Sequence, residues 1–201
     1  MENLITVYIP TKNRLDLLKR AVNSVLSQTH RPIELIVVSD GSDDGTCDYV
    51  NGLIENISIS LIHNDTSVGA CAARNQAIDV AQGEFITGLD DDDIFLPHRL
   101  ATFLAEWRRQ QEKGVRFSCL FDRRIVNAGD NVALWDTEAS VSAEQIVQSN
   151  AVGNQVFTTP QRMKDAGRFD PAMPAWQDWD MWVRLIKTGG PAYSIQANTY
   201  I

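Results

Sequence analysis

The first ninety residues alternate short apolar runs with amphipathic stretches, and this alternation restricts the fold more than any other feature. Four apolar runs have the length of buried strands, at residues 4–9, 35–39, 57–63 and 85–89. Three stretches between them have helical spacing of apolar residues, at about 15–26, 46–55 and 70–82, the last closed by Gly83 as C-cap. Strands that alternate with helices are typical of a parallel sheet with right-handed crossovers. The sequence therefore predicts an α/β fold with a mostly parallel central sheet.

Four consecutive carboxylates, Asp90 to Asp93, follow the fourth apolar run. In open α/β sheets, ligands bind in the crevice beyond the carboxyl ends of the strands. Like charges repel by about 1 kcal/mol per pair at 4 Å in water, so the run requires a counter-charge. A divalent cation with oxygen ligands, Mn²⁺ or Mg²⁺, supplies one. A solvated acidic turn is the alternative, but it does not explain the buried type of strand that leads into the acids.

The pattern changes in the second half of the chain. It predicts a helix from Pro97 to Gly114, a hairpin within 115–136, a short helix after Ser142, a strand at 155–159 and a helix at 178–187. No repeat or low-complexity linker separates the halves. We therefore expect a single domain over residues 1–201, with a parallel half at 1–98 and a mixed half at 99–201.

Composition excludes several classes of function. The net charge of -8 disfavours a nucleic-acid groove, which needs a basic stripe. No apolar run reaches membrane-spanning length and no secretory signal opens the chain, so we expect no transmembrane segment and a cytoplasmic location. The widely spaced Cys47, Cys71 and Cys119 argue against a disulfide framework and against a thiolate metal site, and core positions are expected for them.

Several short motifs follow one another along the chain. They are Ile9-Pro10-Thr11-Lys12-Asn13-Arg14, Ser24 to Thr29, Glu34 to Ser42, Ala73-Arg74-Asn75, Gly83 to Ile86, Leu89 to Asp93 and Trp176-Gln177-Asp178-Trp179-Asp180. Taken together, these motifs resemble those of family 2 glycosyltransferases, which have the GT-A fold. Two positions depart from the family pattern: Ser39 stands where Asp is common, and Gln177 replaces a Glu.

The resemblance assigns roles to individual residues. It implies a nucleotide-binding set of Thr11, Asn13, Arg14, Asp40, Arg74, Asp90 and Asp91. In this set Asp40 is expected to accept a hydrogen bond from a uracil-type base, and Arg74 to approach the diphosphate. Asp92 is the expected metal ligand. Asp93 is the alternative, because four acids in a row allow the motif to be aligned one residue later. Asp178 is the expected general base, with Asp180 as its alternative.

The function that follows is a metal-dependent, inverting glycosyltransferase. It would move a sugar from a nucleotide-diphosphate sugar, with UDP expected, to a hydroxyl of a glycan or lipid-linked acceptor in surface polysaccharide synthesis. A metal neutralises the charge that develops on the leaving phosphate, and an inverting displacement needs one carboxylate as general base. Residues 1–98 would bind the nucleotide sugar, and 99–201 would face the acceptor. Trp176, Trp179 and Trp182 are open to two interpretations, a packed helix face or a platform for an acceptor sugar.

Alternatives from two other classes remain. A sugar-phosphate nucleotidyltransferase should carry a glycine-rich phosphate loop after the first strand, and residues 10–14 contain no glycine. A sugar-nucleotide-binding module without catalytic activity is the other. Family members often continue with acceptor-binding or membrane-associating segments, so a chain that ends at Ile201 is expected to be a catalytic core without them. Peripheral association with a membrane remains open.

Overall fold

A computed structural model describes residues 3–54, 58–128, 131–135 and 138–199. The strands are β1 (Ile5–Thr11), β2 (Ile33–Asp40), β3 (Ile59–Asn64), β4 (Phe85–Gly88), β5 (Leu120–Ala128), β6 (Asn131–Trp135), β7 (Ser140–Val141), β8 (Phe157–Thr158) and β9 (Ala192–Asn198). The helices are α1 (Leu15–Leu26), α2 (Thr46–Ile54), α3 (Ala70–Val80), α4 (Arg99–Glu112), α5 (Ala143–Ile146), α6 (Pro160–Asp165) and α7 (Gln177–Gly189). In the described part of the chain, no helix is long and apolar enough to cross a membrane.

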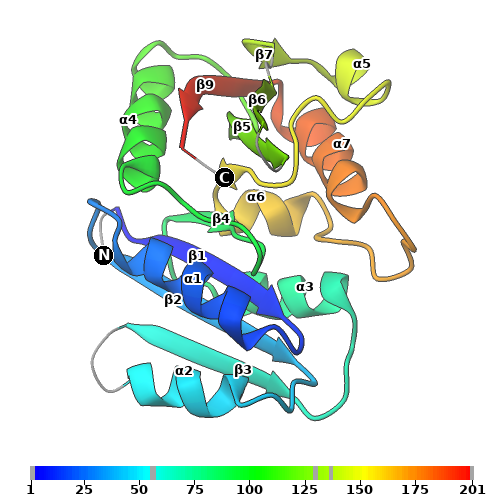
Figure 1. Cartoon of the computed structure of the whole chain (residues 1–201). Coiled ribbons are helices and arrows are strands. Elements are labelled where there is room, and N and C mark those ends of the chain that lie inside the picture. Colours follow the sequence, from blue (N-terminus) through cyan, green and yellow to red (C-terminus); the bar gives the residue numbers. More distant parts are fainter. Residues whose placement is uncertain (1–2, 55–57, 129–130, 136–137, 200–201) are drawn as a thin grey trace.

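One sheet runs through both halves of the molecule (Figure 1). Its strand order is β3-β2-β1-β4-β8-β5-β9-β7, and β6 pairs with β5. Strands β1 to β4 are parallel, with Ile5 opposite both Ile33 of β2 and Phe85 of β4. Strand β8 runs antiparallel to β4 and β5, whereas β9 runs parallel to β5. The predicted mostly parallel first half and mixed second half are therefore confirmed.

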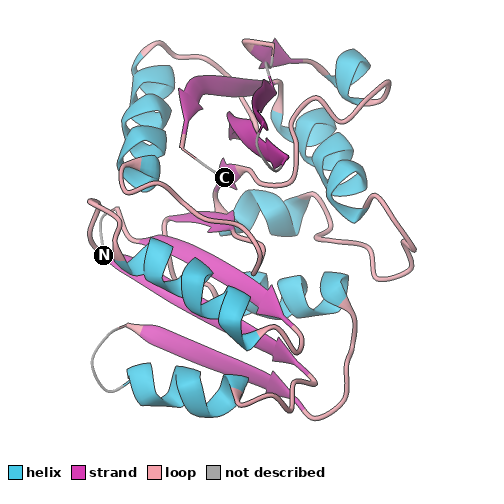
Figure 2. Ribbon diagram, viewed as in Figure 1, coloured by secondary structure: helices cyan, strands magenta, loops and turns pink. Residues whose placement is uncertain are grey.

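Helices cover both faces of this sheet, and each face has its own core (Figure 2). Side chains of a strand alternate between faces, so Val7 of β1 packs into the core with α1, α2 and α4, while the neighbouring Tyr8 packs into the core with α3, α6 and α7. Strands buried on both faces have near-continuous apolar sequences, as the predicted runs do. The parallel strands are thereby fixed in register, and their carboxyl ends meet at one edge.

Two local predictions differ from the structure. Helix α3 ends at Val80 with Ala81 as C-cap, so Gly83 is not its cap; a Cβ on Gly83 would lie 2.5 Å from Oγ1 of Thr6, and the glycine is needed because the chain passes close to β1. Helix α6 was not predicted, since Pro160 was interpreted as a strand end. Pro160 instead occupies the start of that helix, and the Thr159 hydroxyl accepts from the Arg162 N–H as a cap.

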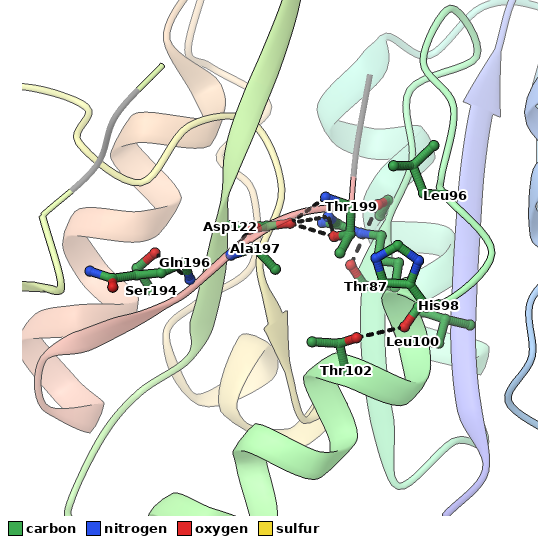
Figure 3. A network of polar contacts seen from close by, with 12 residues as sticks. Thr87, Leu96, His98, Leu100, Thr102, Asp122, Ser194, Gln196, Ala197 and Thr199 are labelled. Carbon is green, nitrogen blue, oxygen red and sulfur yellow. Dashed lines mark hydrogen bonds and ion pairs between the residues drawn. The ribbon is translucent and has the colours of Figure 1, made fainter. Parts of the chain in front are cut away.

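A buried charge network holds the end of β9 against β5 and α4 (Figure 3). The Asp122 carboxylate accepts from the backbone N–H groups of Ala197 at 3.0 Å and Thr199 at 2.9 Å, and also from the Thr199 hydroxyl. Arg99 of α4 donates to the same hydroxyl at 2.9 Å and lies 3.5 Å from Asp122. Both charged side chains are 1% exposed, and the Arg99 guanidinium lies 4.6 Å from the centre of the Phe103 ring. Thr199, the last described residue, is thus part of the protein interior.

Candidate active site

The carboxyl ends of β1, β2 and β4 border a cleft of about 480 Å³ together with the start of α3. Its lining includes seven residues predicted from the sequence: Thr11, Arg14, Asp40, Arg74, Asp90, Asp91 and Asp92. Lys12 also lines it. These residues come from segments up to 81 positions apart in the sequence, so the parallel register of the sheet is what brings them together.

The acidic run lines this cleft with three differently bound carboxylates. Asp90 accepts from Arg74 at 2.9 Å. Asp91 accepts from the Thr11 hydroxyl at 2.7 Å and from Arg14 at 3.1 Å, and the same Arg14 nitrogen lies 3.2 Å from Asp92. Burial raises the pKa of Asp91, and its bonds to Thr11 and Arg14 only partly offset this. Two arginines therefore supply part of the counter-charge that the sequence required.

Asp92 is the acid with the most suitable position for a metal. Its side chain is 53% exposed at the cleft, whereas Asp93 is not among the residues that line the cleft. Within the described residues, no group of three or more Asp, Glu, His or Cys side chains is arranged to hold a metal ion. Mg²⁺ is commonly bound by one or two carboxylates with substrate phosphates and water. The donor set thus fits a metal shared with a bound diphosphate and does not form a complete protein cage.

Positive groups line the cleft beside the acids. Lys12, Arg14 and Arg74 line it, and so does the first turn of α3 at Gly69 and Ala70. The start of a helix carries a partial positive charge and unpaired N–H groups, which favour anions. Burial lowers the pKa of Arg74, but Asp90, Tyr8 and Cys71 together outweigh this effect and raise the pKa above its ordinary value, so the side chain stays charged. The cleft can therefore hold a phosphorylated ligand even though the chain as a whole is acidic.

Asp40 shapes one wall of the cleft. Its two carboxylate oxygens accept from the Asn64 amide at 3.0 Å, the Ser67 hydroxyl at 2.7 Å, and the N–H groups of Val68 at 2.8 Å and Gly69 at 3.0 Å. Burial raises the pKa of Asp40, but these four hydrogen bonds outweigh it and lower the pKa. A carboxylate offers about four acceptor sites, and here they hold the end of β3 and the loop before α3 in place; the contact of Asp40 with a base stays a prediction.

Asn13 connects two loops beside the cleft, and its contact with the nucleotide stays a prediction. Its backbone has the left-handed φ of 52°, its N–H donates to the Ser42 hydroxyl at 3.1 Å, and its side-chain oxygen accepts from the Asp43 N–H at 2.9 Å. The side chain thus connects the loop after β1 to the turn after β2. It is not among the residues that line the cleft, so its contribution to the cleft is indirect.

A second cavity of about 230 Å³ adjoins the first and contains Asp178. Arg74 and Asp90 line both cavities, and Asn154 and Gln177 complete the second. Burial raises the pKa of Asp178, and backbone N–H groups and Arg74 offset this only in part. Asp180 does not line this cavity and is paired with Arg184 at 2.6 Å. Of the two candidate bases, only Asp178 is in a position to meet a ligand that contacts Arg74 and Asp90.

The loop that precedes β8 fixes the position of Asp178. The Asn150 amide donates to Asp178 at 3.1 Å and to the Gly153 carbonyl at 3.2 Å, and it accepts from the Gly153 N–H at 3.1 Å. The indole N–H of Trp182 donates to the same Gly153 carbonyl at 2.9 Å. Asn150 and Asn154 were missed from the sequence, because no periodic pattern or motif marks residues 147–154.

The three tryptophans of α7 and its N-cap divide between two environments. Trp182 is fully buried in the core with α3 and α6, whereas Trp176 is 72% exposed and precedes the helix in a left-handed conformation. The Trp179 indole N–H donates to the Ile146 carbonyl at 2.5 Å, and its ring meets that of Trp176 edge to face. Core packing therefore accounts for Trp182 but not for Trp176, which lies two residues before Asp178 in the sequence.

Comparisons with known proteins place the chain in a family. The model of glycosyl transferase family 2 matches residues 6–136. The putative colanic acid biosynthesis glycosyl transferase WcaA of Escherichia coli (strain K12) is 38% identical, over 98% of this chain and 71% of the relative. The putative teichuronic acid biosynthesis glycosyltransferase TuaG of Bacillus subtilis (strain 168) is 30% identical, over 96% and 75%. The chain spans only 31% of a Rickettsia conorii relative named as an uncharacterized glycosyltransferase.

Solved structures agree on the fold. The crystal structure of S. aureus TarS 1-349 in complex with UDP has a TM-score of 0.78 at 19% identity, over 98% of this chain and 59% of that one. Mannosyltransferase PcManGT from Pyrobaculum calidifontis, in complex with GDP-Man and Mn²⁺, has a TM-score of 0.69 at 18% identity, over 96% and 54%. The fold, the family model and the relatives all agree, and the chain belongs to glycosyl transferase family 2, with the GT-A fold.

Proposed function

We propose that this glycosyltransferase moves a sugar from a nucleotide-diphosphate sugar, with UDP as the nucleotide, to a hydroxyl of a glycan or lipid-linked acceptor, with inversion. The observation that carries the proposal is that two adjacent cavities share Arg74 and Asp90: one contains anion-binding groups, and the other contains a carboxylate of raised pKa. Relatives named for colanic acid and teichuronic acid synthesis support a role in surface polysaccharide synthesis. TarS complexes with UDP and UDP-GlcNAc support the choice of nucleotide.

In this proposal the larger cleft is the donor site. Lys12, Arg14 and Arg74 contact the diphosphate with the first turn of α3, since cationic side chains and helix starts favour phosphate. Asp40 acts by holding the 67–69 loop as the wall of this site. Asp92 would hold Mn²⁺ or Mg²⁺ together with the diphosphate, and that cation would neutralise charge on the leaving group. The Mn²⁺ in the PcManGT complex supports this choice of cofactor.

The smaller cavity is the acceptor site in this proposal, and Asp178 is the general base. The Asp178 carboxylate takes the proton from the acceptor hydroxyl while the hydroxyl oxygen bonds to the anomeric carbon and the nucleoside diphosphate departs. A base works best when its pKa approaches the working pH, and burial moves Asp178 in that direction. Asn150 fixes one carboxylate oxygen, and the exposed Trp176 offers a flat face to a sugar ring. Residues of 1–98 thus provide the donor side, and residues of 99–201 the acceptor side.

Titration calorimetry with UDP, with Mn²⁺ and then with EDTA, tests the donor site. We expect tight binding only with metal, and loss of the metal effect in Asp92→Ala but not in the matched Asp93→Ala. A thermal melt gives an independent readout, because a ligand at a hundred times its dissociation constant adds about 2.7 kcal/mol of stability. UDP affinity that EDTA leaves unchanged would refute the metal site, and an effect confined to Asp93→Ala would move the ligand by one residue.

A product assay separates transfer from the alternatives. We expect the protein to release UDP from a UDP-sugar in proportion to a glycosylated acceptor. Binding without release would identify a sugar-nucleotide-binding module, and formation of a sugar nucleotide from a sugar phosphate and a nucleoside triphosphate would identify a nucleotidyltransferase. GDP-sugars run in parallel test the choice of nucleotide, since the PcManGT complex contains GDP-Man.

A further inference from the structure

A cluster of Cys47, His63, Asp65 and Ser39 lies outside both cavities, where α2 meets β2 and β3. Ser39 of β2 is directly opposite His63 of β3 in the parallel register, and Cys47 is the second residue of α2. The Sγ atom of Cys47 lies 3.1 Å from Nδ1 of His63, and Nε2 of His63 lies 3.8 Å from the Asp65 carboxylate. The sequence placed Cys47 in the core, and this was wrong: Cys71 and Cys119 are buried, but Cys47 is partly exposed.

The arrangement is that of a nucleophile, a base and a group that orients the base. Nε2 of His63 lies 3.8 Å from the Asp65 carboxylate, and the tautomer with the proton on Nε2 leaves Nδ1 as an acceptor for the Cys47 thiol. Ser39 is fully buried, and its hydroxyl lies 3.2 Å from Nδ1 of His63 and 3.6 Å from the sulfur of Cys47. These contacts hold both groups in place. Cys47 also lies in the first turn of a helix, where negative charge on sulfur is stabilised.

A metal site explains this cluster less well than a reactive thiol does. A structural zinc site takes four ligands from Cys, His, Asp or Glu, and no group of three such side chains in the described part of the chain is arranged to hold an ion. The solvent reaches the cluster, since the His63 side chain is 37% exposed and the Asp65 side chain is fully exposed. A soluble electrophile can therefore reach the sulfur, whereas the two buried cysteines are shielded.

We propose that Cys47 is a modification site, a nucleophilic thiol that forms mixed disulfides with small soluble disulfides. The sulfur of Cys47 attacks one sulfur of the disulfide, so that a new S–S bond forms as the old one breaks. The thiol proton passes to Nδ1 of His63, and the departing thiolate takes up a proton from the resulting imidazolium. Asp65 stabilises the imidazolium while it exists. No oxidant other than the disulfide is consumed.

The site lies beside one wall of the donor cleft but on the other side of the sheet. Asn64 follows His63 in β3, and its amide donates to Asp40, which holds the 67–69 loop. Neighbouring side chains of a strand point to opposite faces, so His63 faces α2 while Asn64 faces the α3 side. A group attached to Cys47 would therefore not enter the cleft directly. Modification and donor binding can be measured separately.

Reaction of the full chain with oxidised glutathione at pH 7, followed for each cysteine by mass spectrometry of its peptide, tests the proposal. We expect Cys47 to react at least about tenfold faster in the folded chain than in the chain unfolded by urea, because a positioned base contributes a factor of roughly 10²–10⁴. The buried Cys71 and Cys119 should stay unreacted in the folded chain. A Cys47 rate equal to or below that of the unfolded chain would overturn the proposal.

Two substitutions identify the partners of the thiol. His63→Gln should lower the Cys47 rate at least about tenfold, since no base remains within reach of the sulfur. Asp65→Asn should lower it less, and Asp48→Asn, which removes another exposed acid near Cys47, is the charge control that should not lower it. An unchanged rate in His63→Gln would also overturn the proposal. If circular dichroism shows that His63→Gln is not folded, the comparison of folded and unfolded wild-type chain decides alone.

Discussion

Replacement of Asp178 by Asn separates catalysis from structure more cleanly than any other change at the site. The amide has the shape of the carboxylate, and its oxygen can still accept from the Asn150 amide, which lies 3.1 Å away. What is lost is a group that can take a proton. Asp178→Asn should therefore fold, bind UDP with metal as the wild type does, and fail in transfer to the acceptor.

The expected change in stability can be compared with the expected loss of catalytic rate. Asp178 is in the first turn of α7, and loss of its charge there costs about 0.3–1 kcal/mol of stability. The substitution also removes a charge from a half-buried position, which is favourable and opposes this cost. The net change in the free energy of unfolding should therefore stay below about 1 kcal/mol. Loss of a positioned base lowers the rate by roughly 10²–10⁴-fold, which is about 3–5 kcal/mol of barrier. The catalytic loss should exceed the change in stability severalfold.

Steady-state transfer to a glycan acceptor, thermal melting and UDP calorimetry on the same preparations provide the assay. Asp180→Asn is the matched control, because it removes an acid of the same helix that pairs with Arg184 and does not line the acceptor cavity. We expect a kcat at least a hundredfold lower in Asp178→Asn and a nearly normal kcat in Asp180→Asn. A turnover near that of the wild type in Asp178→Asn would refute the assignment, and the converse pattern would transfer the role to Asp180.

The pH dependence of stability gives a second check on Asp178. Its folded pKa is raised above the ordinary value, so the folded state binds the proton more tightly than the unfolded state does. Stability from this group is thus present at low pH and is lost as the pH rises through the folded pKa. The melting temperature of Asp178→Asn minus that of the wild type should therefore increase from pH 4 to pH 7. A difference that stays constant would contradict the burial of this carboxyl.

Three further changes probe the rest of the site. Asp40→Ala should lose about 3 kcal/mol of unfolding free energy in urea at pH 7, because four hydrogen bonds to a carboxylate are removed; its folded pKa is lowered, so this difference should shrink as the pH falls through that value. Asn150→Ala should lower kcat about tenfold with UDP affinity unchanged, as expected for a displaced base, and a loss of UDP affinity would contradict this. Trp176→Ala should raise the acceptor KM about tenfold through lost ring contact, while an altered melting temperature would indicate a structural role.

The parallel half of the fold was predictable because local pattern and tertiary environment agree there. Strands buried on both faces have near-continuous apolar sequences, and the runs at β1, β2 and β4 are mostly apolar, with buried Thr6 and Thr87 among the exceptions. In the second half the elements are short, and their partners are distant. Strand β8 (Phe157–Thr158) lies within the predicted strand at 155–159, but its pairing with β4, some seventy positions away in the chain, could not be predicted from local sequence. Helix α6 was missed since a proline both ends strands and starts helices.

In the candidate site, too, features that depend on local sequence were predictable and features that depend on tertiary contacts were not. The acidic run was found because a strand's carboxyl end is a ligand edge whatever the ligand is, whereas Arg74, in α3, was assigned from the resemblance to the family. The four bonds to Asp40 could not be foreseen, because they depend on the loop at 67–69 folding back over the end of β2. Asn13 was assigned by resemblance to the nucleotide, yet its left-handed backbone directs its amide toward the turn at residues 42 and 43. Sequence predicted which edge is functional but not which polar groups there are already occupied.

The buried pair of Arg99 and Asp122 determines where this protein can be cut. Both charges are satisfied by residues at the end of β9, among them the Thr199 hydroxyl and its N–H. A version shortened before Ala197 would leave Asp122 paired with Arg99 but without the hydrogen bonds from Ala197 and Thr199. Hydrogen bonds to a charged group are worth roughly 1.5–3 kcal/mol each, a large share of the 5–15 kcal/mol that holds an ordinary domain together. Shortened versions, C-terminal fusions and C-terminal affinity tags therefore have to keep Thr199, however far from the cleft that residue lies.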